Sequence, residues 1–153
     1  MPRGKLLVEP TALAGYDSDG LGYKHFRPDA VALPEDGGEL LALVKVLRDL
    51  SVPYVARGAG TSLSGGPVPA QGGVVIHLSR LHRIESIDAD AGVAVVESGV
   101  VLNQLDEALR PHGLYYPPDP STGSVCTLGG NVASNAGGVH CFRYGVTSNY
   151  VLG

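Results

Sequence analysis

The run Arg57-Gly-Ala-Gly-Thr-Ser-Leu-Ser-Gly-Gly66 decides how this chain is interpreted. Apolar segments typical of strands lie on both sides of it, at residues 52–56 and 74–78. Backbone without side chains can approach a phosphate-bearing ligand and aim N–H groups at it, and the hydroxyls within the run add further donors. The run therefore predicts a phosphate nest between two strands. The alternative is a surface loop that is merely rich in glycine.

Two familiar phosphate-binding motifs do not fit this run. It lacks the Gly-Lys-Ser/Thr end of a Walker A loop, so no lysine reaches a phosphate. The dinucleotide fingerprint also fails, because Leu63 stands where the third glycine should be and no helix pattern follows. The predicted nest consequently has neither a helix dipole nor a lysine.

A second glycine-rich run, Gly129-Gly-Asn-Val-Ala-Ser-Asn-Ala-Gly-Gly138, lies far along the chain. Its small residues would let backbone come close to a flat ring or to other backbone. Asn131 and Asn135 could bond backbone groups in the turns, and this structural role is at least as well supported as contact with a ligand. Together the two runs predict one large ligand held from two sides.

The pattern between the runs mixes strands and helices. Asp36 is a plausible N-cap for a helix whose apolar stripe extends to Leu47, and Gly113 ends a second helix. Residues 117–123 are rich in proline and predict irregular structure, whereas 150–153 resemble the start of a strand. The expected strands are 30–33, 52–56, 74–78, 83–88 and 93–97, and the expected second helix is 101–110.

These elements predict an α+β fold. Residues 1–27 are expected to form an N-terminal arm, and residues 28–153 one ligand-binding domain. Within that domain, residues 28–80 would form a βαβ-like lobe, and a mixed sheet with flanking helices would follow. The sheet is expected to be incomplete at its C-terminal side, because the apolar segment Tyr150-Val-Leu-Gly153 resembles the start of a strand that is truncated.

Composition narrows the function further. The chain has 153 residues, 44% of them hydrophobic, a net charge of −4 and no basic run, which excludes a nucleic-acid footprint. No apolar run is long enough for a membrane span, so we expect a cytoplasmic protein. Cys126 and Cys141 match no zinc pattern and are expected to be reduced thiols, and the five histidines show no metal-ligand spacing.

Four runs resemble one known family. The run at 53–66 resembles the pyrophosphate loop of the vanillyl-alcohol-oxidase-type (PCMH-type) FAD-binding domain. The runs at 116–121, 126–138 and 144–153 resemble its FAD-linked 2-hydroxy-acid dehydrogenase branch, which includes the glycolate oxidase D subunit and the D-lactate dehydrogenases. The resemblance covers the N-terminal part of such proteins, and implies a PCMH-type FAD-binding domain whose substrate cap is absent.

The resemblance implies the cofactor-binding residues. In the first run, the loop would wrap the FAD pyrophosphate. In the later runs, two residues would lie along the cofactor, and the others would line the flavin and its ribityl-phosphate arm. These residues are Arg57, Gly58, Ala59, Gly60, Thr61, Ser62, Gly65, Gly66, Pro118, Asp119, Gly129, Gly130, Ser134, Gly137, Gly138, Tyr144 and Gly145.

The resemblance also bears on how FAD is held. Some relatives attach the flavin to a histidine in the first loop, but this loop contains none. Cys126 lies near the place of a cysteine that other relatives use, yet this branch holds FAD without a covalent bond. No catalytic residue and no metal ligand is assigned. His140 beside the second run is expected to be a histidine of the turn.

The implied reaction is the FAD-dependent oxidation of an (R)-2-hydroxy acid, such as glycolate or D-lactate, to a 2-oxo acid. A base takes the hydroxyl proton and the flavin takes the hydride equivalent. Electrons would pass to a partner, either an iron–sulfur subunit, which could also attach the protein to a membrane, or a quinone pool. This chain alone is expected to be inactive. The alternatives are a non-catalytic truncated fragment or assembly module and, less well matched by 126–138, a reductase of UDP-sugars.

Overall fold

The computed structural model describes residues 4–153, which fall into two compact units that divide after Leu81. Each unit is described by itself. The helices and strands of the first unit are β1 (Leu6–Leu7), α1 (Pro10–Leu13), η1 (Ala14–Tyr16), β2 (Ala30–Ala32), α2 (Gly37–Asp49), β3 (Tyr54–Arg57) and β4 (Val74–His77). Those of the second unit are β5 (Ile84–Asp88), β6 (Val93–Val96), α3 (Leu102–Leu109), η2 (Arg110–His112), α4 (Leu128–Ser134), α5 (Cys141–Tyr144) and η3 (Thr147–Tyr150).

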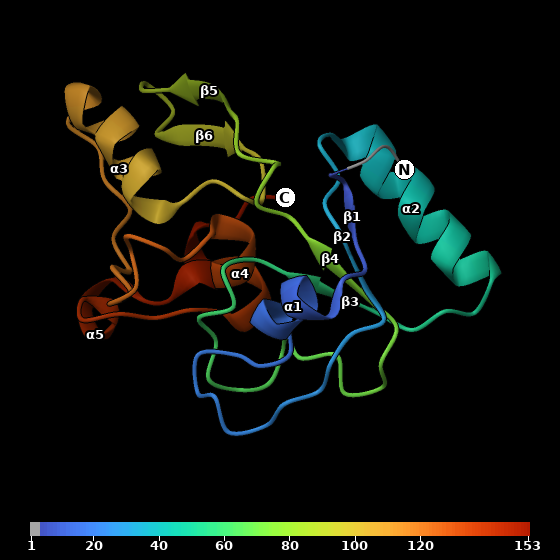
Figure 1. Ribbon diagram of the computed structural model, residues 1–153. Helices are drawn as coiled ribbons and strands as arrows, with labels where there is room; N and C mark the ends of the chain where they lie inside the picture. Colours follow the sequence, from blue (N-terminus) through green and yellow to red (C-terminus); the bar gives the residue numbers. More distant parts are fainter. Residues whose placement is uncertain (1–3) are drawn as a thin grey trace. The chain divides into compact units, whose positions relative to one another are not determined.

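The first unit is built on a four-stranded mixed sheet with the order β1-β2-β4-β3 (Figure 1). Strands β2, β4 and β3 are parallel, and β1 is antiparallel to β2. The connection from β2 to β3 is the helix α2, as the sequence predicted for a βαβ-like lobe. The connection from β3 to the neighbouring parallel strand β4 contains no helix, and it carries the first glycine-rich run.

Apolar residues on the two faces of this sheet hold the first unit together. On one face, Val31 and Val75 pack with Leu13 of α1. The alternate residues Ala32 and Ile76 are also buried, as expected for strands covered on both faces. Figure 1 shows α1 and α2 on opposite sides of the sheet.

The helix α2 begins where the sequence predicted. The Asp36 side chain accepts a hydrogen bond from the backbone N–H of Glu39 at 2.8 Å, which satisfies a donor of the first turn. Residues 1–27, which were expected to form an N-terminal arm, contain β1, α1 and η1, and residues 1–3 of this range lie outside the described residues. Strand β1 pairs with β2, so this end of the chain extends the sheet of the first unit.

In the second unit, the strands expected at 83–88 and 93–97 are present as β5 and β6, which pair antiparallel in a hairpin. Its core is formed by α3 together with Val100, Cys126 and Leu128. An antiparallel bridge joins Val101 to Thr127, so the segment before α3 lies beside the segment before α4. The α+β class is confirmed, and the mixed sheet itself lies in the first unit.

Two local predictions in the second unit are wrong. Turns were expected around Asn131 and Asn135, but residues 129–134 of the second glycine-rich run form the helix α4 together with Leu128. Thr127 caps this helix, and Leu128 and Asn131 are buried. Residues 150–153 do not begin a strand, since η3 ends at Tyr150 and the last residues have no regular structure. No helix within residues 4–153 has the length and the apolar character needed to cross a membrane.

Candidate functional site

The first glycine-rich run forms an exposed loop at the C-terminal end of β3. Gly60 and Gly65 both have a φ of +78°, a left-handed conformation that glycine adopts without strain. A Cβ atom at Gly65 would meet nothing within 4 Å, and the same holds for Gly66. The loop therefore offers open backbone at this end, where a bulky ligand could approach.

The N–H groups of this loop are largely unused. Gly65 donates to Asp19 and Ser64 donates to the Ser62 hydroxyl. The N–H groups of residues 58–63 and of Gly66 make no hydrogen bond to any residue that the structure describes. A series of free N–H donors in a loop is the chemistry that binds an anion.

Arg57 adds a buried positive charge at the start of the loop. Its side chain is 7% exposed, and one Nη atom donates to the Ser18 carbonyl oxygen at 2.6 Å. Burial lowers the pKa of Arg57, while the charges of Tyr16, Asp19 and Asp17 oppose that shift. Arg57 forms no ion pair with a carboxylate of residues 4–153. The loop thus lies beside a cation whose charge is not neutralised by direct contact.

The arginine also shapes the loop. A Cβ atom at Gly60 would stand 2.2 Å from an Arg57 Nη atom, so the guanidinium fills the space that a side chain at position 60 would need. This places Arg57 beneath the backbone at Gly60. A pyrophosphate group matches this loop. It could accept from the free N–H groups, approach the open backbone at Gly65 and Gly66, and balance the charge of Arg57.

Sequence analysis missed two residues of this region. His77 of β4 is paired in register with Arg57, and its ring lies edge-on to the Tyr16 ring, with 5.3 Å between centroids. Burial lowers the pKa of His77, and Nδ1 is buried without a hydrogen-bond partner within residues 4–153. Asp19 accepts from the loop itself. No sequence signal marks either residue, because both act through contacts made by folding.

In the second unit, Gly129 and Gly130 lie in the first turn of α4. Gly129 donates to the Ser98 carbonyl oxygen at 2.8 Å, and a Cβ atom there would stand 2.6 Å from Ser98 Cβ. Gly130 donates to the Thr127 hydroxyl at 3.3 Å, and Ser134 returns a hydrogen bond to the Gly130 carbonyl oxygen at 2.8 Å. Close packing therefore explains Gly129, and helix capping involves Gly130.

The end of the second run lies against the proline-rich segment. A Cβ atom at Gly138 would stand 2.2 Å from the Pro118 carbonyl oxygen. Pro118 is fully buried, whereas Asp119 is exposed and has a left-handed φ of +47°. At Gly137 a Cβ atom would stand 2.6 Å from Cys141 Sγ. The structure thus brings together four of the residues that sequence analysis placed on the cofactor.

Thr147 joins the third run to this group. It is 1% exposed, its hydroxyl donates to the Ala136 carbonyl oxygen at 2.6 Å, and it accepts from the Tyr116 hydroxyl at 2.7 Å. Gly145 ends α5 with a φ of +83°, and the Tyr144 carbonyl oxygen accepts from the Tyr150 hydroxyl at 2.6 Å. The three later runs therefore form one hydrogen-bonded structure.

Within residues 4–153 no three of the His, Cys, Asp and Glu side chains are grouped to hold a metal ion. Cys126 is 3% exposed in the apolar core and Cys141 is partly buried, and neither forms a disulfide. His140 Nδ1 lies 3.7 Å from Asp119 Oδ2 at the surface.

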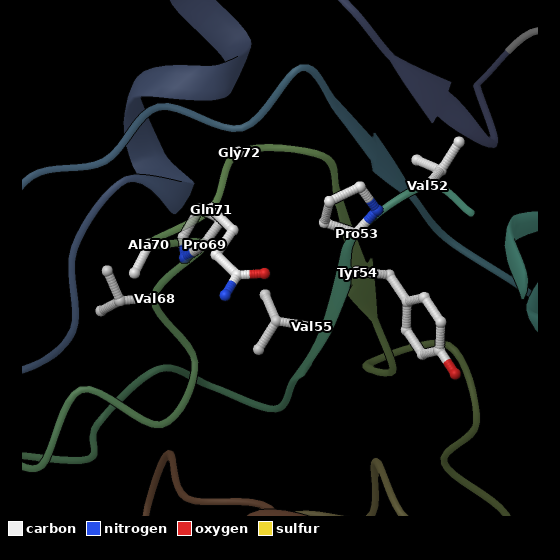
Figure 2. A pocket seen from close by; sticks show the side chains of 9 residues that line it. All are labelled: Val52, Pro53, Tyr54, Val55, Val68, Pro69, Ala70, Gln71 and Gly72. Carbon is white, nitrogen blue, oxygen red and sulfur yellow. The ribbon is translucent and has the colours of Figure 1, made fainter.

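Two hollows lie outside the loop. Figure 2 shows the first, which residues 52–55 and 68–72 line, with Val55 and Val68 beside it and the Tyr54 ring turned away. None of the predicted cofactor residues lines it, and its surroundings are mainly aliphatic. The second hollow, in the other unit, includes Tyr144 and His140.

Comparison with known proteins identifies the kind of site. A family model described as "FAD binding domain" matches residues 28–153. The chain is 41% identical over 152 residues to glycolate oxidase subunit GlcD of Escherichia coli (strain K12), a match that covers 99% of this chain and 30% of the relative. It is 43% identical over 122 residues to D-lactate dehydrogenase of Archaeoglobus fulgidus, covering 80% of this chain and 27% of the relative.

Solved structures agree on the fold. Alkyldihydroxyacetonephosphate synthase superposes with a TM-score of 0.88 at 21% identity, and the match covers 99% of this chain and 30% of that chain. This chain therefore spans about 30% of the length of the curated relatives reported above. The PCMH-type fold and the cofactor that the sequence predicted, FAD, are confirmed.

Proposed function

Since this chain belongs to the FAD binding domain family, we propose that its first glycine-rich loop binds the pyrophosphate of FAD without a covalent bond. The observation that carries this proposal is the pairing of a buried, un-neutralised Arg57 with the free N–H groups of residues 58–63. A doubly charged pyrophosphate would use these donors, and its charge would balance the guanidinium.

We further propose that residues of the later runs, within the second unit, line the flavin and its ribityl-phosphate arm. These residues are Pro118, Asp119, Gly129, Gly130, Ser134, Gly137, Gly138, Tyr144 and Gly145. The hydrogen bonds from Thr147 to Ala136 and from Tyr116 to Thr147 support this proposal, because they fix the backbone around Gly137 and Gly138. A rigid backbone of small residues suits the approach of a flat ring.

The complete protein is proposed to oxidise a 2-hydroxy acid such as glycolate or D-lactate. Relatives whose names state such substrates, at 41% and 43% identity, support this proposal. Bound FAD supplies the hydride acceptor, and the residues of this chain hold and orient the cofactor. The relative named as a subunit supports an assembly of more than one chain. We propose that an iron–sulfur partner receives the electrons in this assembly, in the cytoplasm or at the surface of a membrane.

The cofactor proposal is tested by titrating FAD into the chain while flavin fluorescence is measured. Two glycine variants form a matched pair. Gly65→Ala and Gly92→Ala each place a Cβ atom in open space, at φ values of +78° and +66°, so the backbone strain is similar. Gly65 lies in the loop, whereas Gly92 lies in the β5–β6 turn.

We expect saturable binding by the unaltered chain and by Gly92→Ala, and weaker binding by Gly65→Ala. Equal affinity of both variants would contradict the placement of the cofactor at this loop. Absence of saturable binding by the unaltered chain would instead support the non-catalytic alternative. The oxidation is tested with FAD-loaded protein of the relatives' length, by following flavin absorbance after glycolate or D-lactate is added.

A further inference from the structure

The N-terminal segment 16–22 lies directly against the glycine-rich loop. The backbone N–H of Gly20 donates to the Ser62 carbonyl oxygen at 2.9 Å, and Ser18 accepts from Arg57 at 2.6 Å. A Cβ atom at Gly20 would stand 2.8 Å from the Thr61 carbonyl oxygen, so the two backbones are in close contact. The loop is therefore formed against this segment.

Asp19 provides the side-chain contact between the two. One carboxylate oxygen accepts from the Gly65 N–H at 2.8 Å, and the other accepts from the Leu21 N–H at 3.1 Å. The first bond joins residues 46 positions apart, and the second fixes the turn that holds the carboxylate. Bonds to an ionised carboxylate are stronger than bonds between neutral groups.

These contacts leave the loop's other donors available. The Ser62 carbonyl oxygen points toward Gly20, so the Leu63 N–H of the same planar, trans peptide unit points away from the N-terminal segment. Among the N–H groups of the loop, Asp19 accepts only from that of Gly65. The N–H groups of residues 58–63 and Gly66 make no hydrogen bond to the described residues. The segment thus bonds to Ser62 and Gly65 and leaves the other N–H donors of the loop available to a ligand.

We infer that Asp19 is a positioning residue that holds the glycine-rich loop in its phosphate-binding shape before the cofactor arrives. This inference rests on the proposed function only for the identity of the ligand. The loop is pre-ordered, so binding does not have to fix its backbone. Asp19 acts through Gly65 and does not itself contact the cofactor.

Three variants of the full chain test this role. Asp19→Ala removes both hydrogen bonds, whereas Asp19→Asn keeps an oxygen that can accept from Gly65. Asp17→Ala is the matched control, because Asp17 lies on the same segment but its side chain bonds to His25 Nδ1 at 3.1 Å, not to the loop. Hydrogen exchange of the two amides that join the segment to the loop, those of Gly20 and Gly65, is measured without FAD. The helix α2 is the internal reference, and FAD affinity is measured by flavin fluorescence.

We expect Asp19→Ala to exchange faster at the Gly20 and Gly65 amides and to bind FAD about tenfold more weakly, with α2 unchanged. Asp19→Asn should restore most of both properties, and Asp17→Ala should match the unaltered chain. Unchanged exchange and affinity in Asp19→Ala would overturn the inference. Tighter binding by Asp19→Ala would also overturn it, because the carboxylate would then be a competitor of the phosphate.

The same measurements distinguish a failure of the proposed cofactor site from a failure of the role of Asp19. If the unaltered chain bound no FAD, the cofactor assignment would fail, and the exchange of the Gly20 and Gly65 amides would still decide whether Asp19 holds the loop. If the unaltered chain bound FAD and Asp19→Ala bound it equally well, the positioning role would fail alone.

Discussion

Gly138 lies so close to Asp119 that a Cβ atom on Gly138 would stand 1.9 Å from the Asp119 carbonyl oxygen. Asp119 has a left-handed φ of +47°, which turns its carbonyl group toward the second glycine-rich run. The contact is between backbone atoms, so no side chain can rotate to make room. Position 138 therefore requires glycine for packing, whatever its role toward the cofactor.

Gly138→Ala should accordingly destabilise the second unit by about 3 kcal/mol, at the upper end of the usual cost of forcing extra atoms into a packed site. Hydrogen exchange across residues 82–153 under increasing denaturant would measure the loss. The control is Gly66→Ala, whose Cβ atom would meet nothing within 4 Å and whose φ is ordinary. A stable Gly138→Ala would mean that the 118–119 segment can move away.

Thr147→Val tests the hydrogen bonds that join the later runs. The valine keeps the shape of the side chain but leaves the Tyr116 hydroxyl, now bonded at 2.7 Å, without its acceptor. We expect a loss of about 1 kcal/mol in the free energy of unfolding, because a partly buried hydroxyl without a partner is costly. Tyr116→Phe should cost less, since the Thr147 hydroxyl keeps its bond to Ala136.

The double variant separates the shared contribution of this pair. If the two hydroxyls stabilise one another, the combined loss in denaturant unfolding should be smaller than the sum of the single losses. Strict additivity would indicate that each hydroxyl acts independently.

The sequence predicted those elements whose signals are local. The N-cap at Asp36, the stripe up to Leu47 and the strands at 83–88 and 93–97 each depend on a few neighbouring residues, and the structure has a helix or a hairpin at these places. The prediction from sequence missed α4, because Gly129 and Gly130 disfavour a helix. In the structure, the cap at Thr127 and the burial of Leu128 outweigh that preference.

The same distinction applies to the site. The glycine-rich loop is visible in the sequence because left-handed backbone at Gly60 and Gly65 demands a particular residue type. Asp19 is not visible, because its partner Gly65 lies 46 residues away and the contact exists only after the sheet forms. His77 reads as an ordinary strand residue for the same reason. The direct contacts of the assigned residues with FAD stay predictions.

His77 should make the stability of the first unit depend on pH. Burial lowers its pKa below the ordinary value of 6.5, so the unfolded chain binds a proton more readily than the folded chain. Stability from this residue is therefore present above pH 6.5 and is lost as the pH falls through 6.5 toward the lowered pKa. Urea unfolding at pH 8 and pH 5 would measure the loss.

His77→Phe supplies the comparison, because it keeps an aromatic ring beside Tyr16 and cannot titrate. We expect its stability to fall less between pH 8 and pH 5 than that of the unaltered chain. His112→Phe, at an exposed position, should retain the full pH dependence. An equal fall in His77→Phe would assign the pH dependence to other groups.

Arg57→Met should lower the affinity of the chain for FAD more than it lowers the stability of the chain without FAD. The buried guanidinium makes no ion pair within residues 4–153, so its charge is available to an anion at the loop. Methionine fills a similar volume without the charge. We expect FAD affinity to fall about 10- to 100-fold, as for loss of a charged hydrogen-bonding group.

Thermal unfolding with and without FAD measures this effect, because a ligand that binds only the folded state raises the unfolding temperature. Arg48→Met on α2 removes the same charge from a side chain that is 71% exposed, and it should keep the full FAD-dependent rise. If Arg57→Met kept that rise as well, the guanidinium would serve only to support Gly60 and to bond Ser18. The free N–H groups of residues 58–63 would then have to bind the pyrophosphate without its charge.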